Sequence, residues 1–252
     1  MTEHKPLAVG RRRSPFLAAV LGVIGLAILL GLGTWQVQRL HWKEGLLATI
    51  HSRMNAAPAR LSAIEQRFGT SGDVDYWPVT VRGHFLNDRE RHVLATWQGQ
   101  SGFDIYTPLQ LDDSRIVFVN RGFVPYDRKD PATRQAGEIE GEVTVSGLAR
   151  NPLSKKPSWV VPDNNLRQNI FFWKDLDTMA RSVGLSPASI VPFFIDAGAA
   201  PNPGGLPVGG VTVIDLPNNH LQYAVTWYGL AATLAGVLLV NLWPGLRRFG
   251  KP

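Results

Sequence analysis

Residues 218–243 read NNHLQYAVTWYGLAATLAGVLLVNLW, and this stretch decides the architecture of the chain. From Tyr223 to Trp243 it contains no Asp, Glu, Lys, Arg or His, and a second run of this kind extends from Phe16 to Trp35. A helix rises about 1.5 Å per residue, so a run of about 20 residues can cross the roughly 30 Å hydrocarbon core of a bilayer. The two runs therefore predict transmembrane helices at 16–35 and 223–243.

The positive charge of the chain lies in its two tails. The formal net charge is +6, and it comes from the basic residues of segments 1–15 and 244–252. Because basic clusters mark the cytoplasmic ends of membrane spans, we expect both tails in the cytoplasm. Residues 36–222 then form an extracytoplasmic, periplasmic domain of a bacterial inner membrane protein. The placement of the charge also removes the argument that a basic chain binds nucleic acid.

The first apolar run is interpreted as an uncleaved anchor. The alternative is a cleaved signal peptide, but the run is longer than the usual apolar core of such a peptide. The sequence after it, TWQVQRLHWK, offers no cleavage site with small residues. Trp35, Arg39 and Trp42 recur there at helical spacing, which is typical of a helix leaving the membrane through the headgroup layer.

The segment between the spans has a β pattern after residue 75. A helix is predicted over Trp173–Val183, ending before Gly184, and a weaker helix start at Ser62 precedes Phe68. The expected fold is a membrane protein of the α+β class, with two terminal transmembrane helices flanking one mostly antiparallel β domain that contains one or two helices. Runs rich in β-branched and aromatic residues predict strands at 76–85, 92–97, 103–111, 115–125, 142–148, 193–195 and 211–214.

Composition and motifs argue against an enzyme. The chain has no cysteine, which excludes thiolate catalysis, zinc–thiolate sites and iron–sulfur clusters. It also has no P-loop, dinucleotide fingerprint, nucleophile elbow or His-Glu-x-x-His motif. Histidine remains as a ligand for a metal or haem iron. His84 and His92 flank an Asn-Asp turn, and the spacing predicts a hairpin in which they form either a solvated pair, the favoured reading, or half of a metal site.

His220 stands at the start of the second apolar run. Asn218 resembles an N-cap, which places His220 in the first helical turn with Tyr223, Ala224 and Trp227 on one face. A neutral histidine there could ligate the iron of a planar amphiphile whose ring packs on the aromatic residues. Spacing alone favours the alternative, in which the aromatic residues anchor the helix at the interface.

Small residues occur in both apolar runs. They either pack the two spans against each other or leave one face free for another membrane protein, and the sequence does not separate these accounts. The residues concerned are Gly22, Gly25, Gly31 and Gly33 in the first run and Gly229, Ala232, Thr233 and Gly236 in the second.

Four motifs stand in order along the chain: GTWQVQRLHWK at 33–43, YWPVTVRGHF at 76–85, VNRGFVP at 119–125 and NNHLQYAVTWYG at 218–229. Together they resemble the motifs of the Surfeit locus protein 1 family of cytochrome c oxidase assembly factors. The resemblance covers nearly the whole chain. Tyr228 and Phe123 stand where many relatives have Phe and Trp, and each keeps an aromatic ring.

This resemblance implies a non-enzymatic factor that binds haem a and assists its insertion into the catalytic subunit of cytochrome c oxidase. That subunit, haem a synthase and the lipid bilayer are the implied partners. The histidine that the family motif connects with haem corresponds to His220, which would ligate the iron. Tyr223 and Trp227 would either line the ring or anchor the helix. Arg121 would either pair with a haem propionate or act as a structural turn arginine, the reading that we favour.

Two other functions compete with haem delivery. One is a cofactor-free scaffold that stabilises the oxidase catalytic subunit during assembly. The other is an enzyme that modifies haem, which we disfavour because neither apolar run contains a histidine that could ligate haem within the bilayer.

Overall fold

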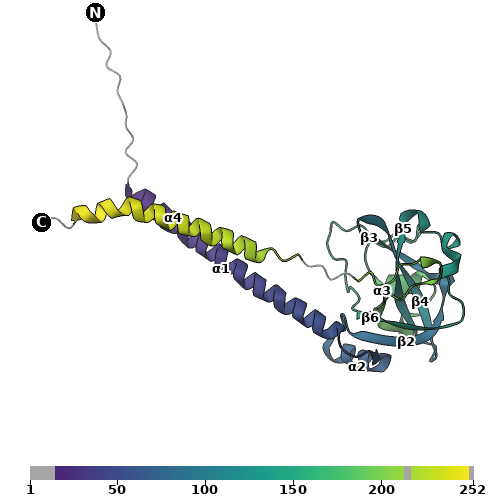
Figure 1. Cartoon of the computed structure of the whole chain (residues 1–252). Coiled ribbons are helices and arrows are strands. Elements are labelled where there is room, and N and C mark those ends of the chain that lie inside the picture. Colours follow the sequence, from purple (N-terminus) through teal and green to yellow (C-terminus); the bar gives the residue numbers. More distant parts are fainter. Residues whose placement is uncertain (1–14, 213–216, 250–252) are drawn as a thin grey trace, which may run out of the picture. The chain divides into compact units, whose positions relative to one another are not determined.

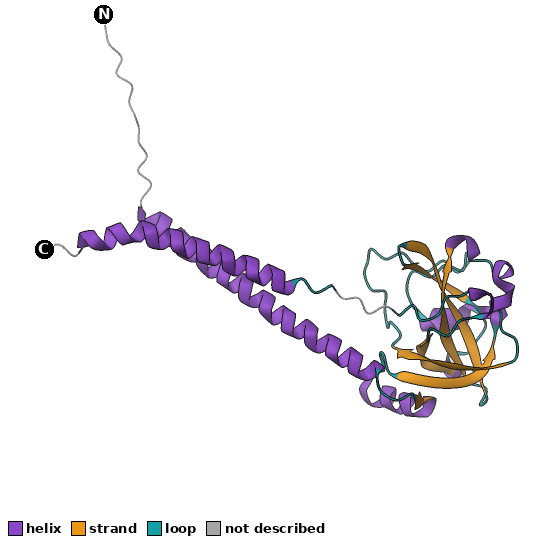
Figure 2. Ribbon diagram, in the orientation of Figure 1, coloured by secondary structure: helices purple, strands orange, loops and turns teal. Residues whose placement is uncertain are grey.

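The computed structural model describes residues 15–212 and 217–249 (Figure 1). The chain divides into a helical unit, formed by residues 1–48 together with 216–252, and a β-rich domain of residues 49–215. The helical unit contains most of α1 (Pro15–Met54) and all of α4 (His220–Phe249). The β-rich domain contains the strands (Figure 2).

Helices α1 and α4 are both long and apolar enough to cross a membrane, with mean hydropathies of 2.6 and 1.6 over their most apolar windows. Most of each window is exposed, whereas the core helix of a soluble protein is mostly buried. The pair is consistent with a two-pass membrane protein. Helix α1 continues to Met54, well past the uncharged run, because residues 36–54 contain good helix formers and no proline. Arg39 lies over the Trp42 ring at 4.3 Å, as the interfacial spacing predicts.

Helices α1 and α4 pack side by side and antiparallel through glycines of α1. Gly22 contacts Leu238, Gly25 faces Leu234, and Gly33 faces the Tyr228 ring, so the contacts run in opposite order along the two helices. A Cβ atom at Gly33 would lie 2.8 Å from Tyr228 Cε1, which shows that only a glycine admits the ring at this distance. Small residues thus allow close helix approach, as the first of the two accounts predicts.

The β-rich domain is built on one mixed sheet in the order β1-β2-β6-β7-β5-β4-β3. A further pairing of β2 with β4, from Gly83–Leu111 to Phe85–Leu109, joins strands that are not neighbours in this order and closes a five-stranded ring. Closure leaves fewer exposed strand edges. The strands are β1 (Ala59–Arg60), β2 (Pro78–Phe85), β3 (Arg91–Trp97), β4 (Gln100–Leu111), β5 (Ile116–Pro125), β6 (Glu142–Arg150) and β7 (Ile190–Ala197).

Most strand pairs are antiparallel, which confirms the α+β class with a mostly antiparallel sheet. The pairs β5–β7 and β1–β2 are parallel. Strand β5 is buried on both faces: Val117 and Val119 enter a cluster that α2 (Leu61–Ser71) covers, whereas Phe118 enters one that α3 (Leu176–Ser182) covers. The two faces of β5 therefore contact two different hydrophobic clusters.

Three local predictions need correction. Helix α2 begins at Leu61 after Arg60, so Ser62 lies within the helix and does not cap it. Val211 and Thr212 lie outside any strand, and residues 213–214 are outside the described residues; the chain instead forms one isolated bridge at Val208, ahead of a Gly-Gly pair. Helix α3 starts later than predicted, because the Asp175 carboxylate caps it by accepting from the Thr178 N–H.

Candidate functional site

His220 is the first residue of α4, and it pairs with a side chain of α1. Its Nδ1 atom lies 2.7 Å from the Gln36 Oε1 atom, and Gln36 is only 9% exposed. An amide oxygen only accepts hydrogen bonds, so Nδ1 carries the imidazole proton and donates it to Gln36. The neutral ring then has its lone pair on Nε2. This is the tautomer of a histidine that ligates a metal or haem iron through Nε2.

Neighbouring contacts hold this end of the two helices together. The Lys43 ammonium donates to the Pro217 carbonyl oxygen, just before α4. The Thr34 and Tyr228 hydroxyls lie 3.1 Å apart, two turns further along α4. Ala224, one turn after His220, is buried. The position of the His220 ring is therefore fixed by the α1–α4 packing rather than by α4 alone.

The aromatic residues predicted beside His220 are accessible in the described chain. Tyr223 is 53% exposed and Trp227 is half-buried. Asn218 is not the N-cap that the sequence predicts, because α4 begins at His220 and the Tyr223 N–H donates to the Asn219 carbonyl oxygen. No partner for the buried Asn218 Oδ1 atom occurs within the described residues. These residues fit a haem. Within the described residues, Nε2 of His220 has no hydrogen bond, and accessible aromatic rings lie on the same helix.

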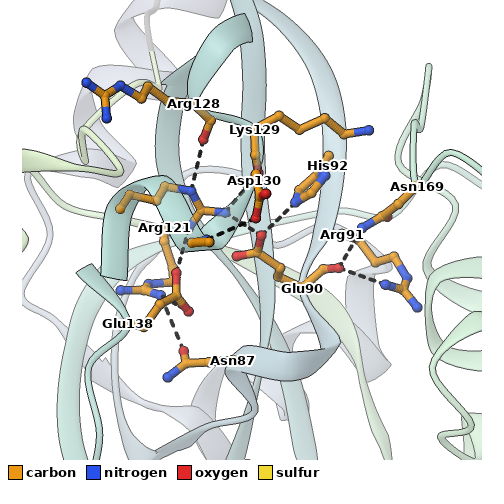
Figure 3. A network of polar contacts seen from close by, with 12 residues as sticks. Asn87, Glu90, Arg91, His92, Arg121, Arg128, Lys129, Asp130, Glu138 and Asn169 are labelled. Atoms are coloured by element: carbon orange, nitrogen blue, oxygen red, sulfur yellow. Dashed lines mark hydrogen bonds and ion pairs between the residues drawn. The ribbon is translucent and has the colours of Figure 1, made fainter. Parts of the chain in front are cut away.

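Arg121 lies within the β-rich domain and is 2% exposed. Its terminal nitrogens donate to the Gly137 carbonyl oxygen and, at 3.4 Å, to Asn87 Oδ1 (Figure 3). Its guanidinium lies 4.6 Å from the Phe85 ring centroid. Burial lowers the pKa of Arg121, although Glu138 and Glu90 act in the opposite direction. These contacts favour the structural reading of Arg121 over a propionate partner.

A β-bulge lies within the VNRGFVP motif and accounts for its glycine and for the directions of the residues before it. Asp104 pairs with Phe123 and Tyr106 with Asn120, so β5 carries one more residue than β4 between these pairs. Gly122 takes a φ of 122°, and its α-carbon faces the Val208 carbonyl oxygen too closely for any side chain. A bulge re-aims the flanking side chains. Arg121 thereby joins the buried charges, whereas Asn120 bonds to Asp196 of β7.

Arg121 belongs to a buried charge network that no sequence pattern reveals. Arg134 is ion-paired with both Glu90 and Glu138, the latter at 2.6 Å, and His92 Nε2 lies 2.6 Å from Glu90 Oε1. Figure 3 shows the His92 ring pointing at the Glu90 carboxylate. His92 is close to Glu90 in the chain, and Arg134 is close to Glu138, but the Arg134–Glu90 pair joins residues 44 positions apart, which local spacing does not predict.

The predicted His84–His92 hairpin is wrong. The Asn87–Arg89 segment is a short 3₁₀ helix, and β2 pairs with β6 and β4 while β3 pairs with β4. His84 is exposed and His92 is buried against Glu90. Within the described ranges, no group of three or more His, Cys, Asp or Glu side chains could hold a metal ion.

Gln36 is the site residue that sequence reasoning missed. It follows directly on the uncharged run 16–35, but Gln38 lies two residues further on, and the sequence alone does not separate Gln36, which is buried, from Gln38, which is exposed. Only the packing of α4 on α1 shows that Gln36 meets His220.

Comparison with known proteins identifies the family. The SURF1 family model matches residues 23–232. Surfeit locus protein 1 of Homo sapiens is 40% identical over 234 residues, covering 86% of this chain and 74% of that protein. The Rattus norvegicus protein is 38% identical over 222 residues, covering 82% and 69%, and a SURF1-like protein of Monosiga brevicollis is 36% identical over 262 residues, covering 99% and 94%. Family model and relatives extend over most of the chain, so the chain belongs to the SURF1 family.

Proposed function

We propose that this chain is a membrane-anchored, non-enzymatic assembly factor that binds haem a through His220 and assists its insertion into the catalytic subunit of cytochrome c oxidase. The observation that carries the proposal is the Gln36–His220 hydrogen bond, which leaves Nε2 as a free ligand atom. When bound, haem a supplies the iron that Nε2 ligates and a ring that aromatic side chains can contact. Gln36 orients the imidazole and sets its tautomer.

The place of His220 suits an amphiphilic cofactor. His220 begins α4, and the uncharged run starts at Tyr223, so the ligand atom lies where the polar and apolar parts of the helix meet. An apolar tail would partition into the bilayer beside α4 while the ring stays near its surface. Tyr223 and Trp227 would contact the ring from the same helix.

The orientation proposed is a bacterial inner membrane protein with both tails in the cytoplasm and the β-rich domain in the periplasm. The antiparallel packing of α1 and α4 supports this, because it brings the far ends of both uncharged runs to one side. The basic tails adjoin those ends in the sequence. His220 then lies at the periplasmic surface.

The direct test is the absorption spectrum of the full chain purified from cells that make haem a. We expect a haem a spectrum at a stoichiometry approaching one haem per chain. Protein purified without haem, and unable to take up haem a added in detergent, would remove the cofactor part of the proposal.

Changing Gln36 should weaken haem binding without removing the ligand. With Gln36→Leu we expect about a tenfold or greater loss of haem affinity, because hydrogen-bond partners of ligating histidines contribute that much to metal sites. Gln36→Glu should restore binding and raise the iron–histidine stretching frequency, because a carboxylate accepts more strongly from Nδ1–H. Spectroscopic titration and resonance Raman spectra measure the two effects. Equal haem affinities of the wild type and the Gln36→Leu variant would show that the bond only packs the helices.

A scaffold function is the second candidate, and one observation favours it. The α4 face formed by Gly229, Ala232, Thr233 and Gly236 is exposed, and no atom lies within 4 Å of a Cβ atom built on either glycine. This face does not contribute to the α1–α4 contact, so it can receive another membrane helix.

A larger side chain on that α4 face should affect scaffolding without affecting haem binding. We expect Gly236→Leu to reduce copurification of the oxidase catalytic subunit about tenfold, equivalent to about 1.4 kcal/mol, while haem content is unchanged. Gly31→Leu is the matched control, because Gly31 of α1 also has no neighbour within 4 Å. Equal copurification with the wild type and with the Gly236→Leu variant would exclude this face as the contact surface.

A further inference from the structure

A row of polar side chains crosses the middle of the sheet. Tyr106 of β4 is in register with Asn120 of β5, and Asn120 is in register with Asp196 of β7. All three are buried. Neighbouring positions on this face, Phe118 and Phe194, belong to the cluster under α3. Polar groups in the centre of a sheet cost free energy unless they are hydrogen-bonded, and an apolar row would pack there without that requirement. Departures of this kind occur at functional sites.

A cavity of about 380 Å³ lies over this row. The polar row forms part of its wall, and Phe172 and Trp173 give it an aromatic wall. Two backbone irregularities lie at its edge: the β5 bulge opposite Asp104 and Tyr106, and Tyr76, which holds a φ of 67°. Bulges and strained residues cluster at functional sites.

Two charged groups of the cavity, Lys174 and Asp104, form no close ion pair in the described part of the chain, although each acts on the other electrostatically. The Lys174 ammonium has no hydrogen bond or ion pair there, and its aromatic contact with Phe194 is distant, at 5.9 Å. Asp104 has no ion pair, only a hydrogen bond with Asn120. Burial lowers the pKa of Lys174, whereas burial and the nearby Asp196 raise the pKa of Asp104 to about 6.

The other charges of the cavity are already paired. Asp196 accepts from Asn120 at 3.2 Å and from the Thr212 hydroxyl at 2.8 Å. Arg150 pairs with Asp75 at 3.2 Å and lies 4.2 Å from the Tyr76 ring centroid. Within the described residues, the cavity therefore offers one cation, Lys174, and one carboxyl group, Asp104, that are in no close ion pair.

We infer that this cavity binds a small organic acid that also carries a hydroxyl or ammonium group. Lys174 pairs with the carboxylate of the ligand, and Asp104 accepts a hydrogen bond from its hydroxyl or ammonium group. The apolar part of the ligand packs on Phe172 and Trp173. A metal cation is a poor fit because Lys174 and Arg150 repel it, and a phosphate dianion is a poor fit because Asp104 and Asp196 repel it. The inference is independent of haem binding, since all these groups belong to the β-rich domain.

Two acids that differ in one hydroxyl group test the site. The detergent-solubilised full chain is titrated with 3-phenyllactate, with 3-phenylpropionate and with inorganic phosphate, and binding is followed by calorimetry. We expect 3-phenyllactate to bind at least about fivefold more tightly than 3-phenylpropionate, because only it bonds to Asp104. Phosphate should not bind measurably.

Variants assign the two contacts. Lys174→Met should lower the affinity for both acids at least about tenfold. Lys155→Met, which changes an exposed lysine, should leave both affinities unchanged. Asp104→Val should abolish the preference for the hydroxy acid while 3-phenylpropionate still binds. Tighter binding of phosphate, or no saturable binding of either acid at millimolar concentrations, overturns the inference. The wild-type titrations decide this even if a variant fails to fold.

Discussion

Replacing His220 with alanine should leave the purified protein without haem a. Alanine removes the imidazole that Gln36 orients, and with it the Nε2 ligand atom. Loss of an axial ligand is expected to lower haem affinity at least about a hundredfold, because ligation of the iron, not ring contact alone, holds a haem in place. Reconstitution with haem a in detergent, followed by absorption spectroscopy, measures the loss.

His41→Ala is the matched control for His220→Ala. His41 is also a histidine of the helical unit, it is exposed, and it lies in α1 outside the Gln36–His220 pair. This variant should retain haem as the wild type does. If His220→Ala kept its haem, the iron ligand would have to be another group, and the scaffold function would become the better account of the chain.

The local elements of the fold could be predicted from the sequence because they depend on short-range patterns. Six of the seven predicted strand segments lie in strands, and the helix before Gly184 ends as expected, with Gly184 at a φ of 70°. The closure of the sheet could not be predicted, since it depends on contacts between Gly83 and Leu111. The parallel pairing of β5 with β7, which joins Asn120 to Asp196, likewise has no local signal.

Of the two hydrogen-bonded residues of the candidate site, the sequence predicted His220 and did not predict Gln36. His220 stood out because it precedes an uncharged run, a feature that one segment displays by itself. Its partner Gln36 is 184 residues away, and only helix packing joins them. The burial of Arg121 depends on the β5 bulge. The NRG triplet alone does not predict this bulge, because the bulge depends on the approach of Val208 to Gly122. Sequence therefore finds single exceptional residues more readily than it finds pairs.

Loss of Arg134 should be costly for the stability of the β-rich domain, because this residue is the cation of the buried charge network. Its side chain is 1% exposed and neutralises both Glu90 and Glu138. Arg134→Met should lower the free energy of unfolding by about 3–5 kcal/mol, because it leaves buried carboxylates without their cation. Arg89→Met is the control: Arg89 makes a long, exposed pair with Asp88 at 3.7 Å, which contributes about 0–1 kcal/mol. Urea unfolding of the full chain in detergent, followed by tryptophan fluorescence, measures both.

The pH dependence of this loss tests its electrostatic cause. Burial alone would raise the pKa of Glu90, but the bond with His92 and the charge of Arg134 outweigh it and hold the pKa below its ordinary value. In the wild type, Glu90 therefore contributes stability that is present above its unfolded pKa of about 4.5 and is lost as the pH falls. Removing Arg134 shifts the Glu90 pKa upward, so protonation of Glu90 then removes a buried negative charge that has lost its cation. The deficit of the Arg134→Met variant should consequently shrink between pH 7 and pH 5, whereas a deficit that stays constant over this range would assign the loss to packing instead of charge.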